Sequence, residues 1–163
     1  MSTVYMFLLL AVPLTSDAMP PQVSRIAKRD AGCNTGWMSY QKSCYSVGQE
    51  AMSWMDAKTA CQARGAYLAE VTDKSEHDWI VAQLKRLNST SVWLGASDLL
   101  IEGVWNWQTN KQPFGPVLFW SAGQPDNGGG EFCLEMRQGY GYMWNDLVCA
   151  VKNKFICESK AKA

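Results

Sequence analysis

Histidine, net charge and long apolar runs are scarce in this sequence, and each scarcity excludes a class of protein. The 163 residues contain 15 basic side chains, 15 acidic side chains and one histidine, His77. A chain without excess positive charge has little attraction for nucleic-acid phosphates. Enzymes that use a nucleophile need a base or a metal, whereas His77 is predicted to lie on the solvated face of a helix beside Asp78. We therefore expect neither a nucleic-acid binder nor an enzyme.

The sequence also lacks an apolar run long enough to span a membrane. Residues 4–14 (VYMFLLLAVPL) fall well below the roughly 20 residues of a membrane-spanning helix and match the core of a signal peptide. We expect residues 1–18 to be a signal peptide, with a buried N-terminal helix or strand as the alternative. Residues 19–29 are then a linker, or a propeptide that ends in Lys28-Arg29. The protein is expected to be secreted and to have no membrane anchor.

The C-x-x-C pairs of a zinc site are missing too, so the six cysteines predict disulfides instead. An even number of cysteines in a secreted chain normally forms a disulfide framework. Six cysteines allow fifteen pairings, and spacing alone does not choose among them. The cysteines are Cys33, Cys44, Cys61, Cys133, Cys149 and Cys157.

Capping signals predict two helices. The first starts at Ser53, with Asp56 three residues later, and ends at Gly65. The second has Asp73 as its N-cap and Glu76 three residues later. A spacing of three and four residues then gives the second helix an apolar stripe. The stripe consists of Trp79, Ile80, Gln83, Leu84 and Leu87.

Strands are predicted on both sides of these helices. Residues 36–47 predict a hairpin, and beyond residue 88 the pattern changes to a period of two. The alternating segments are residues 91–94, 104–107, 132–136 and 154–157. Residues 108–130 contain three prolines and five glycines and fit no regular element. Irregular segments of this length in a compact domain are usually functional.

Oxygen-bearing side chains gather at the end of this irregular segment and again near Trp144. Carboxylate and carboxamide oxygens are hard ligands that suit Ca²⁺ and suit soft metals poorly. No single local run supplies them, so they converge only if the fold brings the two segments side by side. Asn127-Gly128 alone is more simply interpreted as a turn. The candidate ligands are Gln124, Asp126, Glu131, Asn145 and Asp146.

Several motifs together make residues 33–158 resemble the C-type lectin-like domain, and in particular the secreted single-domain, perlucin-like lectins of molluscs. The resemblance depends on six cysteines in the family's long-form order and on motifs at the family's spacing. The motifs are Trp93-Leu94-Gly95, Ala96-Ser97-Asp98, Ile101-Glu102-Gly103, Trp105-x-Trp107, Gln124-Pro125-Asp126 and Trp144-Asn145-Asp146.

The resemblance implies an α+β fold in which two helices flank two small antiparallel sheets, with a long loop that binds calcium and ligand. The two ends of the domain are expected to lie close together, and residues 159–163 to form a tail. The implied disulfides are Cys33–Cys44, Cys61–Cys157 and Cys133–Cys149.

A principal Ca²⁺ site made by the five candidate ligands is also implied, and in this family two neighbouring sugar hydroxyls bind the metal directly. The cation has more coordination positions than the protein fills, so hydroxyls can replace waters and also hydrogen-bond to the ligands. Gln124 precedes Asp126, as in galactose-type members, whereas the reverse order, Glu-Pro-Asn, accompanies mannose-type binding. Pro125 is expected to follow a cis peptide bond. No aromatic residue follows this motif closely, and Tyr142 or Tyr140 is the candidate to stack on the sugar instead.

An auxiliary Ca²⁺ site of the family is only partly matched. Asp98 and Glu102 correspond to its ligands, but Asn127 and Phe132 stand where further carboxylates are often found. We expect this site to be weak or empty.

Two other features of the sequence fit the resemblance. Glu70, Glu76 and Glu158 resemble a further site of some members, although helix capping explains Glu76 equally well. Asn88 begins an N-glycosylation sequon, Asn-Ser-Thr, which is also a common chance pattern.

These inferences predict a secreted, calcium-dependent lectin for glycans with terminal galactose or N-acetylgalactosamine. The alternative is a shell or biomineral matrix protein of the perlucin type, in which sugar binding is secondary. Without the first 29 residues, 12 basic residues face 14 acidic ones, and a net charge of −2 does not favour direct adhesion to mineral. Innate immune recognition of microbial glycans, shell formation and a secreted gland product would all leave the same set of ligand residues in the sequence. No heptad or collagen-like segment indicates an oligomeric state.

Overall fold

The computed structural model describes residues 32–109, 111–116 and 118–162, so the predicted signal peptide and the linker or propeptide lie outside the described residues. The elements are β1 (Met38–Tyr40), β2 (Ser43–Val47), α1 (Trp54–Gln62), β3 (Tyr67–Leu68), α2 (Lys74–Arg86), β4 (Val92–Ser97), β5 (Asn106–Trp107), β6 (Cys133–Arg137), the 3-10 helix η1 (Gln138–Tyr140), β7 (Met143–Leu147) and β8 (Lys154–Lys160). Within the described ranges, neither helix is long and apolar enough to cross a membrane.

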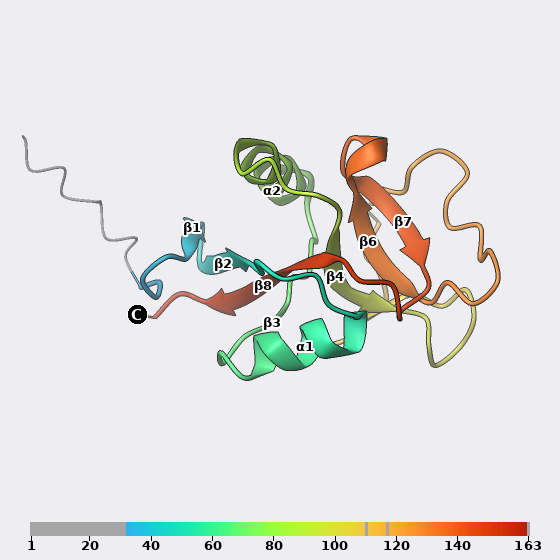
Figure 1. Cartoon of the computed structure of the whole chain (residues 1–163), viewed down its shortest axis with the longest axis horizontal. Coiled ribbons are helices and arrows are strands. Elements are labelled where there is room, and N and C mark those ends of the chain that lie inside the picture. The colour runs from blue at the N-terminus through green and yellow to red at the C-terminus, as the bar shows by residue number, and fades with distance from the viewer. Residues whose placement is uncertain (1–31, 110, 117, 163) are drawn as a thin grey trace, which may run out of the picture.

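The strands form two antiparallel groups that share a seam. β1 pairs with β2, and both β2 and β3 pair with β8; β4 pairs with β5 and β6, and β6 pairs with β7. β4 and β8 run parallel and join the two groups through Val92–Lys154 and Trp93–Phe155. The two helices lie on opposite sides of this seam (Figure 1). The expected α+β arrangement is confirmed.

The predicted strand segments are found, with differences at their ends. β4, β6 and β8 extend beyond the predicted C-terminal ends. The segment 104–107 is a strand only from Asn106, because the Val104 N–H donates to the Ile101 carbonyl in a turn. β3 and β7 are strands that the alternation did not predict.

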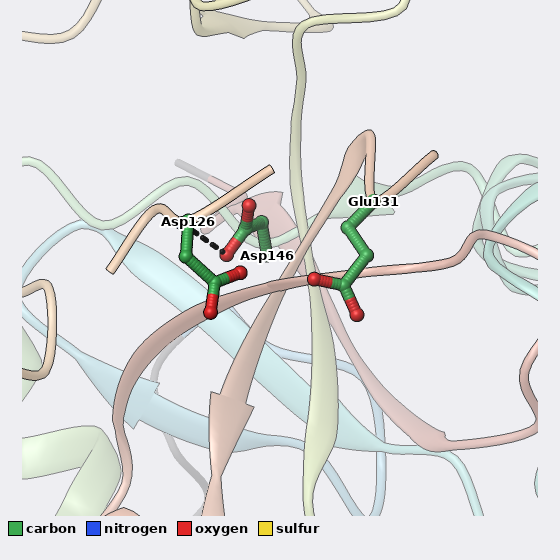
Figure 2. A group of neighbouring side chains, drawn as sticks. All are labelled: Asp126, Glu131 and Asp146. Carbon is green, nitrogen blue, oxygen red and sulfur yellow. Dashed lines mark hydrogen bonds between the residues drawn. The ribbon is translucent and has the colours of Figure 1, made fainter. Parts of the chain in front are cut away.

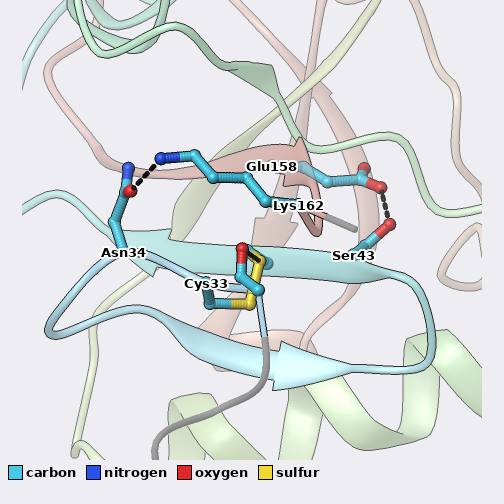
Figure 3. Close-up of a disulfide and its surroundings, with 7 residues drawn as sticks. Cys33, Asn34, Ser43, Glu158 and Lys162 are labelled. Atoms are coloured by element: carbon cyan, nitrogen blue, oxygen red, sulfur yellow. Dashed lines mark hydrogen bonds between the residues drawn. A yellow bond between two sulfur atoms is a disulfide. The ribbon is translucent and has the colours of Figure 1, made fainter.

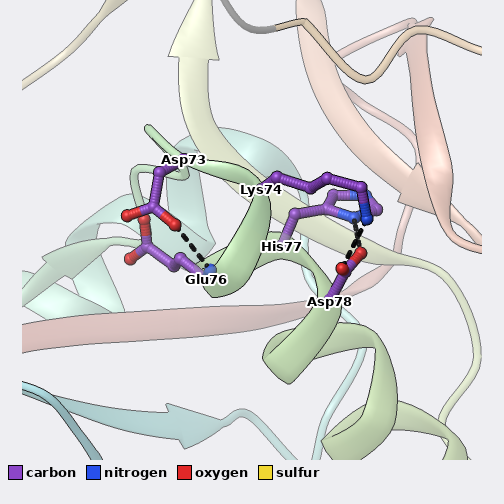
Figure 4. A network of polar contacts seen from close by, with 5 residues as sticks. All are labelled: Asp73, Lys74, Glu76, His77 and Asp78. Carbon is purple, nitrogen blue, oxygen red and sulfur yellow. Dashed lines mark hydrogen bonds and ion pairs between the residues drawn. The ribbon is translucent and has the colours of Figure 1, made fainter.

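Both helices start at their predicted caps. Ser53 Oγ accepts the N–H of Asp56 at 3.2 Å, and the Asp73 carboxylate accepts the N–H of Glu76 at 2.9 Å. Figure 4 shows the second of these caps at the start of α2. Gly65 follows α1 with a φ of +68°, as expected of a glycine that ends a helix.

Two expectations for α2 are wrong. Leu87 does not complete the apolar stripe, because it is the C-cap residue and is 46% exposed. His77 is not solvated: it is 5% exposed, and its ring stacks on Phe119 with 4.1 Å between ring centroids. Burial lowers the pKa of His77. The segment that covers His77 comes from the long irregular loop, whose path the helical pattern does not reveal.

The three disulfides have the pairing that the family resemblance implies, Cys33–Cys44, Cys61–Cys157 and Cys133–Cys149. The ends of the domain lie together, as expected, because the Lys162 N–H donates to the Gly32 carbonyl at 2.8 Å. Figure 3 shows this region, where Lys162 Nζ also donates to Asn34 Oδ1 at 3.1 Å. The domain therefore continues past residue 158, and most of the expected tail is part of it.

β4 lies very close to the segment that contains β3. Every residue of β4 is buried, and the Gly95 N–H donates to the Ala69 carbonyl at 2.8 Å. A Cβ atom on Gly95 would lie 2.2 Å from the carbonyl oxygen of Leu68. Only glycine therefore fits at this position.

Buried carboxylates gather where β8 meets β2 and the start of α2. Glu158 is 6% exposed and accepts hydrogen bonds from Ser43 Oγ at 2.8 Å and from the Glu70 N–H at 3.2 Å. The Tyr45 hydroxyl donates to Glu76 in the same cluster. Burial raises the pKa of Glu158 to about 7, against the opposing effect of its two hydrogen bonds.

The substitution Gly95→Ala should destabilise the fold, because the new methyl group must displace the backbone of β3. We expect the free energy of unfolding, measured by urea titration of the oxidised protein, to fall by about 3 kcal/mol. Gly139→Ala is the matched control, since a Cβ there meets no atom within 4 Å and the backbone is not left-handed. Equal stability of the two variants would contradict the close approach of β4 to Leu68.

Glu158 should make the fold less stable as the pH rises. The native carboxyl, with its raised pKa, keeps a proton that the unfolded chain releases above the usual pKa of 4.5. Its contribution to stability is therefore complete below pH 4.5 and is lost as the pH rises through about 7.

The measurement is the free energy of unfolding against pH, in the presence of a chelator. Glu158→Gln should lack this decline, because the amide does not titrate. Glu50→Gln, at an exposed position, controls for the loss of one negative charge and should keep the decline. Parallel profiles for the wild type and Glu158→Gln would contradict the prediction.

Candidate metal centre

Three of the five predicted ligands form a compact carboxylate group. One oxygen from each of Asp126, Glu131 and Asp146 lies within 4.8 Å of the others. Figure 2 shows the three side chains meeting from the long loop and from β7. Asp126 is exposed, Glu131 is half-buried and Asp146 is fully buried. The fold therefore brings together side chains that are up to 20 residues apart.

Asp146 holds the loop against the sheet. It lies in β7 opposite Leu134 of β6, and its side chain has no exposed surface. One carboxylate oxygen accepts the N–H of Asn127 at 2.8 Å, and the other accepts the N–H of Asp126 at 3.4 Å. The strand thus fixes the position of the loop before any ligand binds.

Gln124 joins the group through Asp126. The Gln124–Pro125 peptide bond is cis, as expected. Gln124 Nε2 donates to Asp126 Oδ2 at 3.2 Å, and the Asp126 N–H donates to Gln124 Oε1 at 3.1 Å. The carboxamide and the carboxylate therefore lie side by side at the surface of the loop.

Gly128 allows the loop carboxylates to approach each other. A Cβ atom at this position would lie 3.0 Å from Glu131 Oε2 and 3.2 Å from Asp126 Oδ1. The turn interpretation of Asn127-Gly128 is thus compatible with a role in the site. Asn127 has a φ of +51°, in the left-handed region that asparagine tolerates best after glycine.

Asn145 adjoins the carboxylate group, but its amide makes other contacts. It is 2% exposed, and its Nδ2 donates to Glu135 Oε1 at 3.0 Å. Glu135 Oε2 accepts Asn153 Nδ2 at 2.7 Å. Glu135 and Asn153 were missed by the sequence reasoning; an acidic residue at an inward position of a predicted strand was the only signal. They orient Asn145, and this leaves its carbonyl oxygen as the remaining ligand atom.

The negative charge of the three carboxylates is not balanced by ion pairs among the described residues. Partial burial, and then the charges of Asp146 and Asp126, raise the pKa of Glu131. Among the described residues, no lysine or arginine forms an ion pair with these three carboxylates. Concentrated negative charge with hard oxygen donors is the chemistry that a divalent cation such as Ca²⁺ satisfies. The residues present therefore fit such an ion.

The predicted auxiliary ligands lie on the loop after β4. Asp98 is 1% exposed; its Oδ2 accepts the Gly103 N–H at 2.9 Å, while its Oδ1 is buried without a hydrogen-bond partner. Partial desolvation, and then the charges of Asp98 and Asp146, raise the pKa of Glu102. Glu102 therefore faces both sets of carboxylates. An unpaired buried oxygen suits a metal ligand, although Asn127 and Phe132 add no carboxylate here.

The predicted stacking tyrosines do not reach the site. Tyr142 is 4% exposed, and its hydroxyl donates to the Ser89 carbonyl at 2.6 Å. Tyr140 is exposed, but it lies at the β6–β7 turn with Arg137 over its ring. Asp146 lies near the other end of β7, and four residues of strand span about 13 Å. Both rings are therefore in the wrong place to pack on a sugar at the carboxylate group.

Two further predicted sites are placed as follows. Glu76 and Glu158 lie in the buried cluster already described, where Glu76 also accepts the Thr72 N–H at 3.0 Å. Glu70 contributes its N–H to Glu158, while its carboxylate accepts the Thr109 N–H at 2.9 Å. Asn88 is exposed in the turn after α2, a position accessible to glycosylation.

Comparison with known proteins identifies relatives of this chain. The family model for the lectin C-type domain matches residues 50–159. Perlucin of Haliotis laevigata is 39% identical over 132 residues, which cover 79% of this chain and 84% of that protein. A perlucin-like protein of Mytilus galloprovincialis is 34% identical over 119 residues, which cover 72% and 76% of the two chains.

A solved structure has the same architecture. The carbohydrate-recognition domain of the mouse scavenger receptor C-type lectin superimposes with a TM-score of 0.74 and 32% identity, over 80% of this chain and 100% of that domain. The family model, the perlucin relatives and the solved structure all point to the same family. This chain belongs to the C-type lectin domain family.

Proposed function

We propose that this protein is a secreted, calcium-dependent lectin. The observation that carries the proposal is the convergence of Asp126, Glu131 and Asp146, with Gln124 and Asn145 beside them. In the part of the chain that the structure describes, no lysine or arginine forms an ion pair with these carboxylates. The early apolar run at residues 4–14 and the three disulfides favour the secretory pathway.

A bound Ca²⁺ would supply open coordination positions for two neighbouring sugar hydroxyls. The protein's own groups would then complete recognition by hydrogen bonding. Carboxylates of Asp126 and Glu131 can accept hydrogen bonds from hydroxyl groups, and the carboxamide of Gln124 can donate to a hydroxyl oxygen. The Nδ2 of Asn145 already donates to Glu135, so Asn145 would contribute its carbonyl oxygen to the cation instead. Charge-assisted bonds of this kind fix the order of donors and acceptors around the ligand.

Galactose-type sugars are the preferred ligands. The support is the order of Gln124 and Asp126, which offers the amide first and the carboxylate second. Asp126 is exposed and Gln124 is half-buried, which leaves this pair accessible at the loop surface. Asp98 and Glu102 are proposed as a weaker auxiliary cation site that stiffens the neighbouring loop.

A role in shell or biomineral matrix is the second candidate, favoured by the 39% identity to perlucin. It is compatible with sugar binding. The two proposals differ in whether a chelator abolishes retention, because adsorption driven by charge alone does not need the ordered site.

Asp146→Asn should weaken calcium binding and sugar binding together. Losing one ligand charge should weaken Ca²⁺ binding, measured by calorimetry, at least about tenfold. Retention on a galactose resin in calcium should be lost in parallel. Asp78→Asn, an exposed position on α2, is the control with the same change in charge and should behave as wild type. Retention that persists in chelator would reject the lectin proposal.

Exchanging the two residues that flank Pro125 should change the sugar preference. In Gln124→Glu/Asp126→Asn the amide and the carboxylate trade places and the net charge stays the same. We expect the ratio of galactose to mannose inhibition constants to shift roughly tenfold toward mannose, or ~1.4 kcal/mol. Gln49→Glu/Asp78→Asn makes the same change in composition away from the site. An unchanged ratio with retained calcium binding would contradict the galactose assignment.

A further inference from the structure

An apolar tip lies beside the candidate metal centre. Leu99, Leu100 and Ile101 follow β4 and are 47%, 73% and 64% exposed. We call these three residues the apolar tip. Three consecutive large apolar side chains at this exposure are unusual for a water-facing loop, and exposed apolar patches commonly mark a binding surface.

Hydrogen bonds within the loop hold the apolar tip in place. The Gly103 N–H donates to Asp98 Oδ2 at 2.9 Å, and the Val104 N–H donates to the Ile101 carbonyl at 2.9 Å. These bonds close the loop at its base and leave the apolar side chains pointing outward. Because the loop is closed, exposing the tip does not depend on local unfolding.

The tip and the metal centre share one end of the molecule. Ser97 of β4, Cys133 of β6 and Leu147 of β7 are paired in a row across the sheet. The Asp98 N–H donates to the carbonyl of Phe132, which directly follows Glu131. In Figure 1 the loops after β4 and after β7 leave the sheet at the same end.

Other exposed apolar side chains lie at the same end of the sheet. The structure leaves ten large hydrophobic side chains exposed among the described residues, and six of them are in the loops after β4 and β7. They are Leu99, Leu100, Ile101, Val104, Val148 and Val151. This end therefore combines the acidic candidate metal centre with six of the ten large hydrophobic side chains that are exposed in the described part of the chain.

We propose that the apolar tip enters the interface of a lipid bilayer when the protein binds a sugar carried on a lipid. The inference rests on the proposed function, and it names the ligand class as glycolipids displayed on membranes. When the metal centre holds a sugar that is joined to its lipid by a short link, the bilayer surface comes close to the neighbouring loop. Leucine and isoleucine side chains there gain free energy by leaving water.

Charge favours a membrane over a second copy of the chain. Docking two copies tip to tip would bring their carboxylates face to face, and like charges opposed at an interface are unfavourable. Asp98, Glu102, Asp126, Glu131 and Asp146 all lie at this end. A neutral glycolipid surface imposes no such repulsion.

The test compares two vesicle preparations in calcium. Both consist of phosphatidylcholine with the same surface density of galactose. In one the sugar is on galactosylceramide; in the other it is on a lipid with a long polyethylene glycol spacer that keeps the protein away from the bilayer. Wild-type protein should bind the galactosylceramide vesicles at least tenfold more tightly.

Leu100→Ser/Ile101→Thr should lose most of this tenfold preference and keep its affinity for the spaced sugar. Leu87→Ser removes a leucine of 46% exposure at the C-terminal end of α2 and should keep the preference. Sedimentation of the soluble proteins reports whether the tip joins two copies.

Each outcome has one meaning. If the tip variant and wild type bind both vesicles alike, the membrane proposal is overturned while the lectin proposal stands. If wild type binds neither vesicle in calcium, the proposed function itself fails. If wild type is a dimer that the tip variant dissociates, the tip is an interface between copies and the membrane proposal is wrong.

Discussion

One buried carboxylate connects the sheet to the loop. Asp146 is fixed in β7 by pairing with β6, and its oxygens accept the N–H groups of Asp126 and Asn127. Burying a charged group without partners is costly, so these backbone donors stabilise the side chain and the loop position together. The other ligands then approach Asp146 as a consequence of the loop's path. The geometry of the site is thus a property of strand register as much as of loop sequence.

Aromatic rings of the long loop pack on Trp144 of β7 and support this connection between the loop and the sheet. Trp144 precedes the ligand pair of β7 and lies within 5.1–5.8 Å, between ring centroids, of Phe114, Phe119 and Trp120. The backbone N–H of Trp144 donates to the Phe119 carbonyl at 2.7 Å, and the backbone carbonyl of Trp144 accepts the Ser121 N–H at 2.9 Å. The long loop therefore behaves as an additional layer on the sheet and not as an unattached connection. Edge-to-face contacts of this kind add stability beyond the buried area alone.

The sequence predicts those features that local chemistry decides. Ser53 and Asp73 cap their helices through their own side chains, so their positions are readable without tertiary information. His77 was misjudged because its burial depends on Phe119, which is more than 40 residues away and in a segment without periodicity. The five candidate ligands were recognisable as oxygen donors and by resemblance. That Asn145 is oriented by Glu135, and that Tyr142 turns into the core, follows from strand register, which a single sequence does not specify.

The proposed cation binding and the structure of the loop involve the same carboxylates. The carboxylates of Glu131 and Glu102 have raised pKa values, because partial burial and neighbouring negative charges disfavour their ionised forms. A cation that binds only the native state removes this penalty and stabilises the fold by about 2.7 kcal/mol at a hundredfold excess over its Kd. Asp98 belongs to this charge system through Glu102 and also closes the base of the apolar tip. A bound ion would therefore stabilise the candidate sugar ligands and the base of the apolar tip together, in the geometry that their hydrogen bonds already define.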